Sequence, residues 1–312
     1  MVDAKAESTR ISNRASRRGE NLRTLKIATW LGWQLESNWA DPLVFFIFAV
    51  LRPLASALIL VVMYQVIVGG SRDGFFDYLF ISNAFFMVVI SGLAGMSWAI
   101  IDDRENYKML KYIYTSPARK LAYLVGRSVA KLAMGLLTTV ILLGAGLLFL
   151  GLHIDGGRIE WGWLAAYSVV GTVMLSALGL IMAGVALVVA RHGAFIGEVV
   201  GGALLLFSGA YFPVDILPPV LKEIGLGLPI TYWLEGMRRA LTGGILTSST
   251  VQPDGTVVIQ AVSPLLAAFD NNQLFLILLV STFVSVVVAY FFYNWVEVQA
   301  KERGMIDRVT GY

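Results

Sequence analysis

Long apolar runs separated by short polar intervals dominate the chain. Runs of about 20 residues are long enough to cross a bilayer as helices, and the sequence predicts six of them. Their ranges are 43–68, 75–101, 128–150, 163–190, 194–211 and 274–295. They predict an all-α polytopic membrane protein with six transmembrane helices and a transmembrane domain over residues 42–296.

The N-terminal part predicts two different segments. Residues 1–21 are polar and basic, and we expect a retained, disordered cytoplasmic tail. In residues 22–41, apolar positions recur at helical spacing and three tryptophans accompany them. Because tryptophan favours the membrane–water boundary, we expect a helix lying in the cytoplasmic interface. The alternative is a short extension of the first span.

Several residues inside the predicted spans have two interpretations. Arg52 either extends toward the cytoplasmic headgroups or faces the protein interior beside an acid, and the first is favoured. Glu198 is expected near the cytoplasmic mouth of the fifth span. Small residues are expected to allow close helix packing rather than to line a pore. They are Ser91, Gly92, Gly95 and Ser97 in span two, and Gly193, Gly197 and Gly201 at span five.

The interval 102–126 is too charged to enter a bilayer, yet it is regularly patterned. Aromatic and apolar residues predict a first short helix, on which Met109, Tyr112 and Ile113 share a face. Ser116 and Pro117 then supply an N-cap and a first-turn proline for a second helix that leads into span three. Such an interval offers a binding surface to a cytosolic partner, and the alternative interpretation is a solvated loop.

The interval 212–273 lies between spans five and six and is interrupted by prolines, which exclude one continuous spanning helix. Two short helices are predicted instead, at 218–226 and 231–241, half-inserted or interfacial at the membrane edge. Residues 246–272 contain a Pro-Asp-Gly turn signal and strand-forming residues, and predict an external loop or hairpin. Residues 297–312 are a polar tail.

Composition and charge support this topology. The 312 residues are 57% hydrophobic and only 14% charged, with a net charge of +3. The bases concentrate in the N-terminal tail, in 102–131 and in the C-terminal tail. The positive-inside rule therefore places both termini in the cytoplasm, and the charge indicates no nucleic-acid partner.

Three motifs typical of nucleotide-binding or hydrolytic proteins are absent from the sequence. It contains no phosphate loop, no HExxH and no nucleophile elbow. The two histidines, His153 and His192, fall on opposite sides of the predicted membrane, which argues against a metal site. Few ionisable residues lie deep in the spans, which disfavours an ion-coupled carrier.

Two stretches resemble the ABC-2 type transporter permeases. Residues 104–126 have an acid-rich start, a short helix, a Ser-Pro and a basic helix leading to a glycine, like the loop after the family's second span. Residues 208–241 are similar to its signature near the fifth span, although Leu228 stands where asparagine is common. The resemblance covers about residues 23–243 and span six, whereas the segment 246–272 is longer than expected.

The resemblance implies two functional regions. The first is a cytoplasmic coupling helix on which a separate ATP-binding subunit docks, and the second is a pair of short re-entrant external helices that cap the exit. The implied coupling residues are Arg104, Glu105, Tyr107, Met109, Tyr112, Ile113, Ser116 and Pro117. The implied gate residues are Gly209, Phe212, Pro213, Pro218, Pro229, Tyr232, Glu235 and Arg238.

The resemblance also implies a function. The expected protein is a non-enzymatic permease subunit of an ABC exporter in the cell membrane, paired with a second copy, surrounded by lipids and driven by the ATPase subunit. ATP and Mg²⁺ would be bound by that partner, and no cofactor by this chain. A hydrophobic drug, a lipid or a lipid-linked glycan is the expected substrate. The alternatives are a non-transporting membrane scaffold and, less favoured, an ion-coupled carrier.

Overall fold

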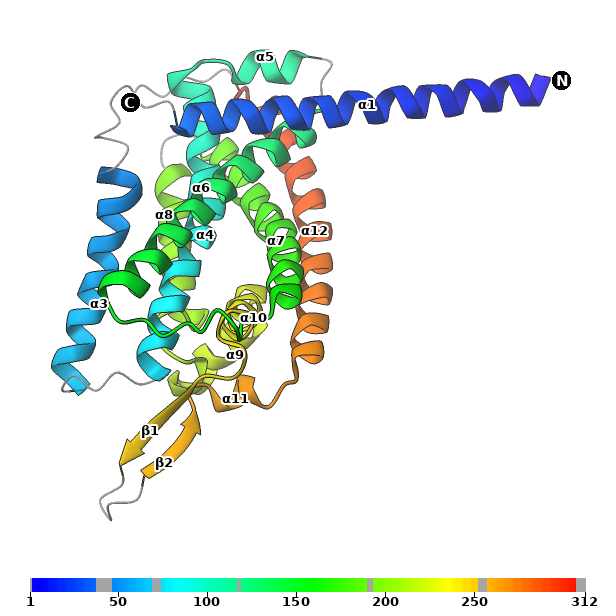
Figure 1. Ribbon diagram of the computed structural model, residues 1–312. Coiled ribbons are helices and arrows are strands. Elements are labelled where there is room, and N and C mark those ends of the chain that lie inside the picture. Colours follow the sequence, from blue (N-terminus) through cyan, green and yellow to red (C-terminus); the bar gives the residue numbers. More distant parts are fainter. Residues whose placement is uncertain are drawn as a thin grey trace.

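The computed structural model describes residues 2–37, 47–68, 74–116, 119–189, 193–251 and 257–306. Most of these residues form helices that run side by side as a bundle (Figure 1). The short helix α5 (Leu110–Thr115) lies at one end, which we name the α5 end. The strands β1 (Thr247–Val251) and β2 (Val257–Ala261) project from the opposite end, which we name the hairpin end.

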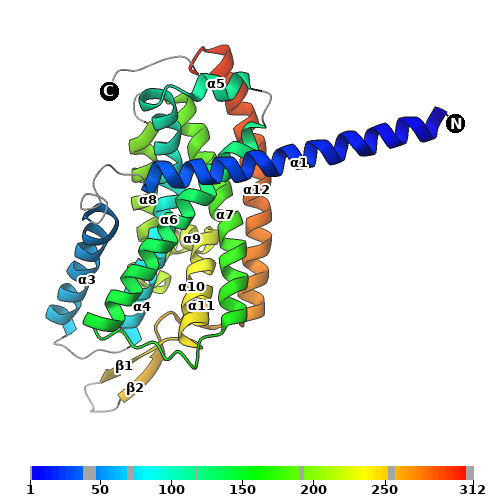
Figure 2. The ribbon, with the colours of Figure 1, turned by 45° about the horizontal axis from the view of Figure 1, so that its top comes forward.

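Helix α1 (Val2–Ser37) crosses the bundle near the α5 end and extends beyond it (Figures 1 and 2). The predicted boundary between a disordered tail at 1–21 and a helix at 22–41 is therefore wrong, because the helix begins at Val2. Residues 2–21 contain no proline and include four arginines and three alanines, which favour helices. The end predicted at residue 41 lies outside the described residues.

Small residues bring α1 close to α6 (Lys120–Phe149). A Cβ added at Gly126 of α6 would lie 2.7 Å from both the Cβ of Ala28 and the carbonyl oxygen of Leu25. A Cβ added at Gly32 would lie 2.7 Å from the Cβ of Ala130. Each helix thus contributes two small residues four positions apart, which is the spacing that lets helix backbones approach.

Helix α4 (Gly74–Ile101) is the centre of the bundle and packs against α6, α7 (Trp161–Val188) and α8 (Gly193–Phe207). A Cβ added at Gly179 of α7 would lie 2.6 Å from the carbonyl oxygen of Gly92. One added at Gly197 of α8 would lie 2.6 Å from the hydroxyl of Ser97. The predicted packing role is confirmed for Gly92, Ser97 and Gly197.

Four of the described helices are long and apolar enough to cross a membrane. They are α4 with its extension to Asn106, α6, α7 and α12 (Asn271–Glu302). The first predicted span corresponds to the π-helix η1 (Ile47–Leu51) and the 17-residue helix α3 (Arg52–Val68). The fifth corresponds to α8, whose 15 residues extend about 22 Å, less than the roughly 30 Å of a hydrocarbon core. The all-helical membrane architecture is confirmed, whereas the count of six spans stays a prediction.

Helix α6 begins at Lys120 and joins the second helix of the polar interval to span three, as the sequence predicts. The C-terminal boundary differs from the prediction. Helix α12 continues to Glu302, so the polar tail predicted from residue 297 is helical at its start. The carboxylate of Glu297 accepts hydrogen bonds from Lys120 and Lys301, both at 2.5 Å, which stabilises this extension.

The hairpin end contains the short elements predicted from its prolines. The 3₁₀ helix η3 (Val214–Ile216) precedes α9 (Pro219–Gly227) and α10 (Pro229–Thr242), and a proline begins each of these two α-helices. Strands β1 and β2 then pair antiparallel, with Thr247 opposite Ala261 and Val251 opposite Val257. The helix α11 (Pro264–Ala267) leads into α12. The two short helices and the hairpin are confirmed, and the predicted turn at 253–255 lies outside the described residues.

The crossing of α1 and α6 generates a prediction. Gly126→Ala should separate the two helices, because its Cβ would meet Ala28 and the backbone of α1. We expect a loss of about 1 to 3 kcal/mol of stability, measured as a lower thermal unfolding midpoint in detergent.

The matched control is Gly144→Ala in the same helix, where an added Cβ meets no atom within 4 Å. This control should be neutral or slightly stabilising, because alanine favours helix. Equal midpoints for both variants would contradict the proposed crossing.

Candidate functional site

Helix α10 is buried in the bundle at the hairpin end, in contact with α4, α7 and α12. Its apolar side chains Ile230, Trp233, Leu234 and Met237 belong to the main hydrophobic core. The indole Nε1 of Trp233 donates a hydrogen bond of 3.0 Å to the carbonyl oxygen of Tyr167 in α7. The charged residues of α10 are therefore carried into an apolar environment.

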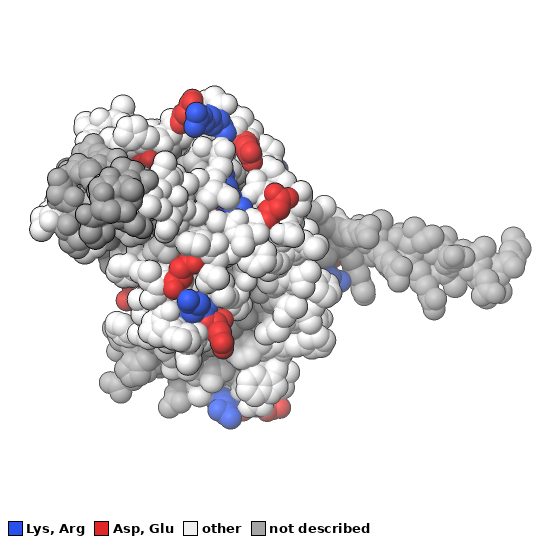
Figure 3. All heavy atoms as spheres, turned by 90° about the horizontal axis from the view of Figure 1, so that it is seen from below, with Lys and Arg blue, Asp and Glu red and all other residues white. Residues whose placement is uncertain are grey.

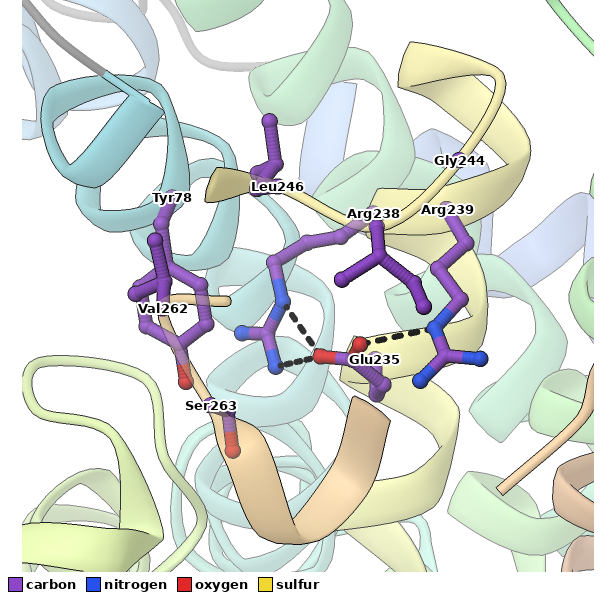
Figure 4. Close-up of a pocket in the computed structure, with 9 residues that line it drawn as sticks. Tyr78, Glu235, Arg238, Arg239, Gly244, Leu246, Val262 and Ser263 are labelled. Atoms are coloured by element: carbon purple, nitrogen blue, oxygen red, sulfur yellow. Dashed lines mark hydrogen bonds and ion pairs between the residues drawn. The ribbon is translucent and has the colours of Figure 1, made fainter. Parts of the chain in front are cut away.

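A single carboxylate joins two buried arginines on α10 (Figure 4). Oε2 of Glu235 accepts hydrogen bonds from Arg238, at 2.7 Å from Nη2 and 3.2 Å from Nε. Oε1 accepts a bond of 2.8 Å from Nε of Arg239. Spacings of three and four residues place both guanidinium groups on the same side of the helix as the carboxylate.

The arginines control the ionisation of Glu235. Burial of this side chain raises its pKa, but the charges and hydrogen bonds of Arg238 and Arg239 lower it more, so the pKa lies below the usual value. The carboxylate is therefore ionised at neutral pH, and it offsets part of the cost of burying two cations.

Arg238 attaches α10 to α4 and to the end of α8. Its Nη1 donates to the hydroxyl of Ser82 at 2.6 Å and to the carbonyl oxygen of Gly209 at 3.2 Å. Its guanidinium lies 3.9 Å from the centre of the Tyr78 ring, a cation–π contact. The Tyr78 hydroxyl also donates to Gly209, at 2.9 Å. Gly209 has a φ of 77°, a conformation that favours glycine.

Arg239 attaches α10 to α11 and to the start of α12. Its Nη1 donates to the carbonyl oxygen of Phe269 and its Nη2 to that of Leu266, at 2.8 and 2.7 Å. The sequence prediction included Glu235 and Arg238 but missed Arg239. The available signal was its position four residues after Glu235, which is as favourable for an ion pair as a separation of three.

The other predicted gate residues shape the segment that leads to α10. Pro213 and Pro218 are the N-caps of η3 and α9, and Pro229 is the first residue of α10. The Tyr232 hydroxyl donates to the carbonyl oxygen of Leu226 at 2.8 Å, which holds α9 against α10. Phe212 is partly exposed at the surface. The structure therefore brings only Gly209, Glu235 and Arg238 together in one cluster.

The α5 end presents aromatic and basic side chains. After α4, the π-helix η2 (Asp102–Asn106) is followed by Lys108, whose φ of 51° turns the chain into α5. On α5, the side chain of Leu110 is buried, whereas that of Tyr112 is 65% exposed. Ile113 and Tyr114 pack against the core around α12. Of Met109, Tyr112 and Ile113, which were predicted to share a face, only Tyr112 is exposed. Between Tyr107 and Ser116 the exposed residues are Tyr107, Lys108, Lys111, Tyr112 and Thr115.

Several predicted coupling residues are structural. Arg104 is buried, and it pairs with the half-buried Glu105 at 3.2 Å. Ser116 is the C-cap of α5 and donates to the carbonyl oxygen of Ile113 at 3.0 Å, so it is not the predicted N-cap. Pro117 lies outside the described residues, and Arg119 is the N-cap of α6.

A buried ionic network lies directly beneath the exposed surface. Asp103 accepts a hydrogen bond of 2.7 Å from the Tyr123 hydroxyl and pairs with Arg127 at 3.3 Å. Lys131 pairs with Glu36 of α1. The sequence prediction missed these residues, since their partners lie far apart along the chain.

The family model of the ABC-2 type transporter matches residues 24–242, more than half of the chain. The chain belongs to the ABC-2 type transporter family. A search of curated proteins found no match. Both stretches that carried the resemblance, 104–126 and 208–241, lie inside the matched range.

The chain is thus the membrane component of a transporter, a multi-pass protein that is not itself catalytic. Within this permease, Glu198 is exposed on α8 and accepts a hydrogen bond of 3.2 Å from the indole of Trp98. The side chain of Arg52 lies outside the described part, so both interpretations of it remain predictions.

The buried carboxylate of the permease generates a second prediction. Glu235→Gln should leave Arg238 and Arg239 buried without a counter-charge, at a cost of about 3 to 5 kcal/mol. The thermal unfolding midpoint should fall accordingly. Glu223→Gln on the exposed side of the neighbouring helix α9 is the matched control and should leave the midpoint unchanged. A small effect at both positions would refute the structural role of Glu235.

The lowered pKa of Glu235 generates a third prediction. In the unfolded chain a glutamate has a pKa of about 4.3. The stabilisation that the ionised Glu235 carboxylate provides is therefore complete above that pH, and it is lost as the pH falls through the lower pKa of the folded state. The difference in midpoint between the natural protein and Glu235→Gln should stay constant from about pH 7 to about pH 5.5 and shrink below about pH 4.3. A difference that shrinks near neutral pH would contradict this assignment.

Proposed function

We propose that this permease is the membrane-spanning subunit of an ATP-binding cassette exporter. It moves a hydrophobic or lipid-linked substrate, such as a drug, a lipid or a glycan, out of the cytoplasm with ATP hydrolysed by a separate subunit. The observation that carries the proposal is the aromatic and basic surface of α5, presented on a chain that has no phosphate loop of its own. ATP and Mg²⁺ bind to the partner, and this chain holds no cofactor.

The exposed surface of α5 is the docking site in this proposal. Tyr107 and Tyr112 are 49% and 65% exposed, and Lys111 lies beside Tyr112. Tyrosines of this kind are frequent anchors of protein interfaces. On the other side of α5, the Tyr114 hydroxyl lies 2.5 Å from that of Tyr293 in α12. A force applied to α5 would therefore reach the bundle.

The α5 end faces the cytoplasm of the cell and both termini lie on that side in this proposal. The support is the concentration of bases in the N-terminal segment, in 102–131 and in the C-terminal segment. The face seen from the hairpin end is largely uncharged, and several of its Lys and Arg side chains lie beside acidic ones (Figure 3). In the loop before α7, Arg158 and Asp155 form an ion pair at 3.5 Å.

A second copy of the permease completes the transporter in this proposal. The short helix α8 exposes apolar side chains, among them Phe195 and Val199, and α3 exposes Ile59, Val62 and Val66. A homodimer built on these faces would bury them, and membrane lipids would cover the apolar surface of α12.

The proposed transport cycle uses the two ends of the bundle. Closure of the ATPase pair pushes α5 and rocks the permease halves, and the short helices around α10 open the external exit. Transport should therefore require ATP. Transport that persists without ATP but stops with an ionophore would instead favour an ion-coupled carrier.

The docking surface generates a fourth prediction. Tyr112→Asp places a charge on the exposed face of α5 and should weaken binding of the ATPase subunit at least about tenfold. Ile113 is left unchanged, because it packs against the core. Binding is measured by co-purification and by titration of the purified subunits.

Gln260→Asp is the matched control, because it adds the same charge to an exposed position of β2 at the opposite end. Both variants should unfold at the temperature of the natural protein. Unchanged ATPase binding by folded Tyr112→Asp would exclude α5 as the docking site.

A further inference from the structure

Helix α7 joins the two regions just described. It runs without a break from Trp161 to Val188, so its 28 residues extend about 42 Å, the depth of a whole membrane. Its first turns lie beside α10, as the two ribbon views agree (Figures 1 and 2). Its last turn is bonded to Arg104 of η2.

At the α5 end, the last turn of α7 is held by Arg104. Nη1 of this buried arginine lies 3.4 Å from the carbonyl oxygens of both Ala186 and Leu187. Carbonyl groups in the last turn of a helix lack their usual helical donors and carry the negative end of the helix dipole. A buried cation therefore fits this position, and it links α7 to the π-helix that precedes α5.

At the hairpin end, the first turns of α7 are held by α10. Besides the bond from Trp233 to Tyr167, the backbone N–H of Glu160 donates to the carbonyl oxygen of Ala240 at 2.9 Å. Gly171 lies so close to the indole of Trp233 that an added Cβ would overlap it, and Gly236 meets the ring of Tyr167 in the same way. The two helices therefore cannot slide past one another without changing this packing.

We infer that α7 transmits movement between α5 and α10, and that Arg104 is the positioning residue that attaches it to the α5 end. Arg104 was predicted to contact the ATPase, but its burial assigns it this internal role instead. The meaning of the link for transport rests on the proposed function, whereas the link itself is a property of the permease chain alone.

The test is hydrogen–deuterium exchange of the full-length permease in lipid nanodiscs, without any ATPase subunit. Arg104→Met removes the donor at the α5 end, and amide exchange is followed in α10 at the opposite end. Coupled sites typically influence each other by about fivefold or more, so exchange in α10 should accelerate by at least that factor. Arg104→Lys keeps a cation and should restore part of the protection.

Two comparisons separate this link from general destabilisation. Lys111→Met removes a charge from the exposed side of α5 and should leave α10 unchanged. Helix α3 packs on α4 and α6, so its exchange should stay constant in Arg104→Met. Equal acceleration in α3 and α10, or acceleration in neither, would overturn the inference.

Coupling between two sites is reciprocal, which allows a second test. Trp233→Phe removes the indole donor without adding volume, and it should accelerate exchange in α5. A change confined to α10 would overturn the link. The exchange experiment contains neither nucleotide nor ATPase subunit, so its outcome does not depend on transport. Export is measured separately, with the ATPase subunit and ATP added. Absence of export together with coupled exchange would refute the proposed function and leave the link intact.

Discussion

The ion cluster of α10 is the interaction on which the hairpin end depends. Placing two guanidinium groups in an apolar bundle costs several kcal/mol for each uncompensated charge. The cost is offset only where Glu235, the hydroxyl of Ser82 and the carbonyl oxygens of Gly209, Phe269 and Leu266 converge. This requirement fixes α10 relative to α4, α8, α11 and α12 at once. The short helix α10, which follows a proline-rich segment, thereby acquires a defined position.

The α5 end is organised by a similar rule with different partners. Asp103 and Arg127 pair beneath the surface, and Arg104 satisfies the carbonyl groups at the end of α7. Small residues allow α1 and α6 to approach closely enough for Lys131 to reach Glu36. Between these polar ends the bundle is held mainly by apolar packing. An apolar bundle with a polar network at each end suits a membrane protein, because buried charges need partners that lipid does not supply.

The sequence predicted the elements well and their contacts less well. Apolar periodicity located α4, α6, α7 and α12, and prolines located α9 and α10, because these signals are local. The start of α1 and the end of α12 were misplaced, since charged residues can continue a helix. In α12, the pairing of Glu297 with Lys120 supports this continuation. The inward packing of Ile113, the burial of Arg104 and the role of Arg239 depend on helices distant in sequence. Spacing along one element does not determine them.

The central claim is that a separate ATPase subunit acts on the exposed face of α5. The chain contains no cysteine, so a single engineered thiol is unique within it. Thiol cross-linking of Lys111→Cys and Gln260→Cys to the ATPase subunit, in the assembled complex, tests the claim most directly. Efficient cross-linking from position 111 and none from position 260 is the predicted result. Cross-linking from position 260, or from neither, would contradict the account.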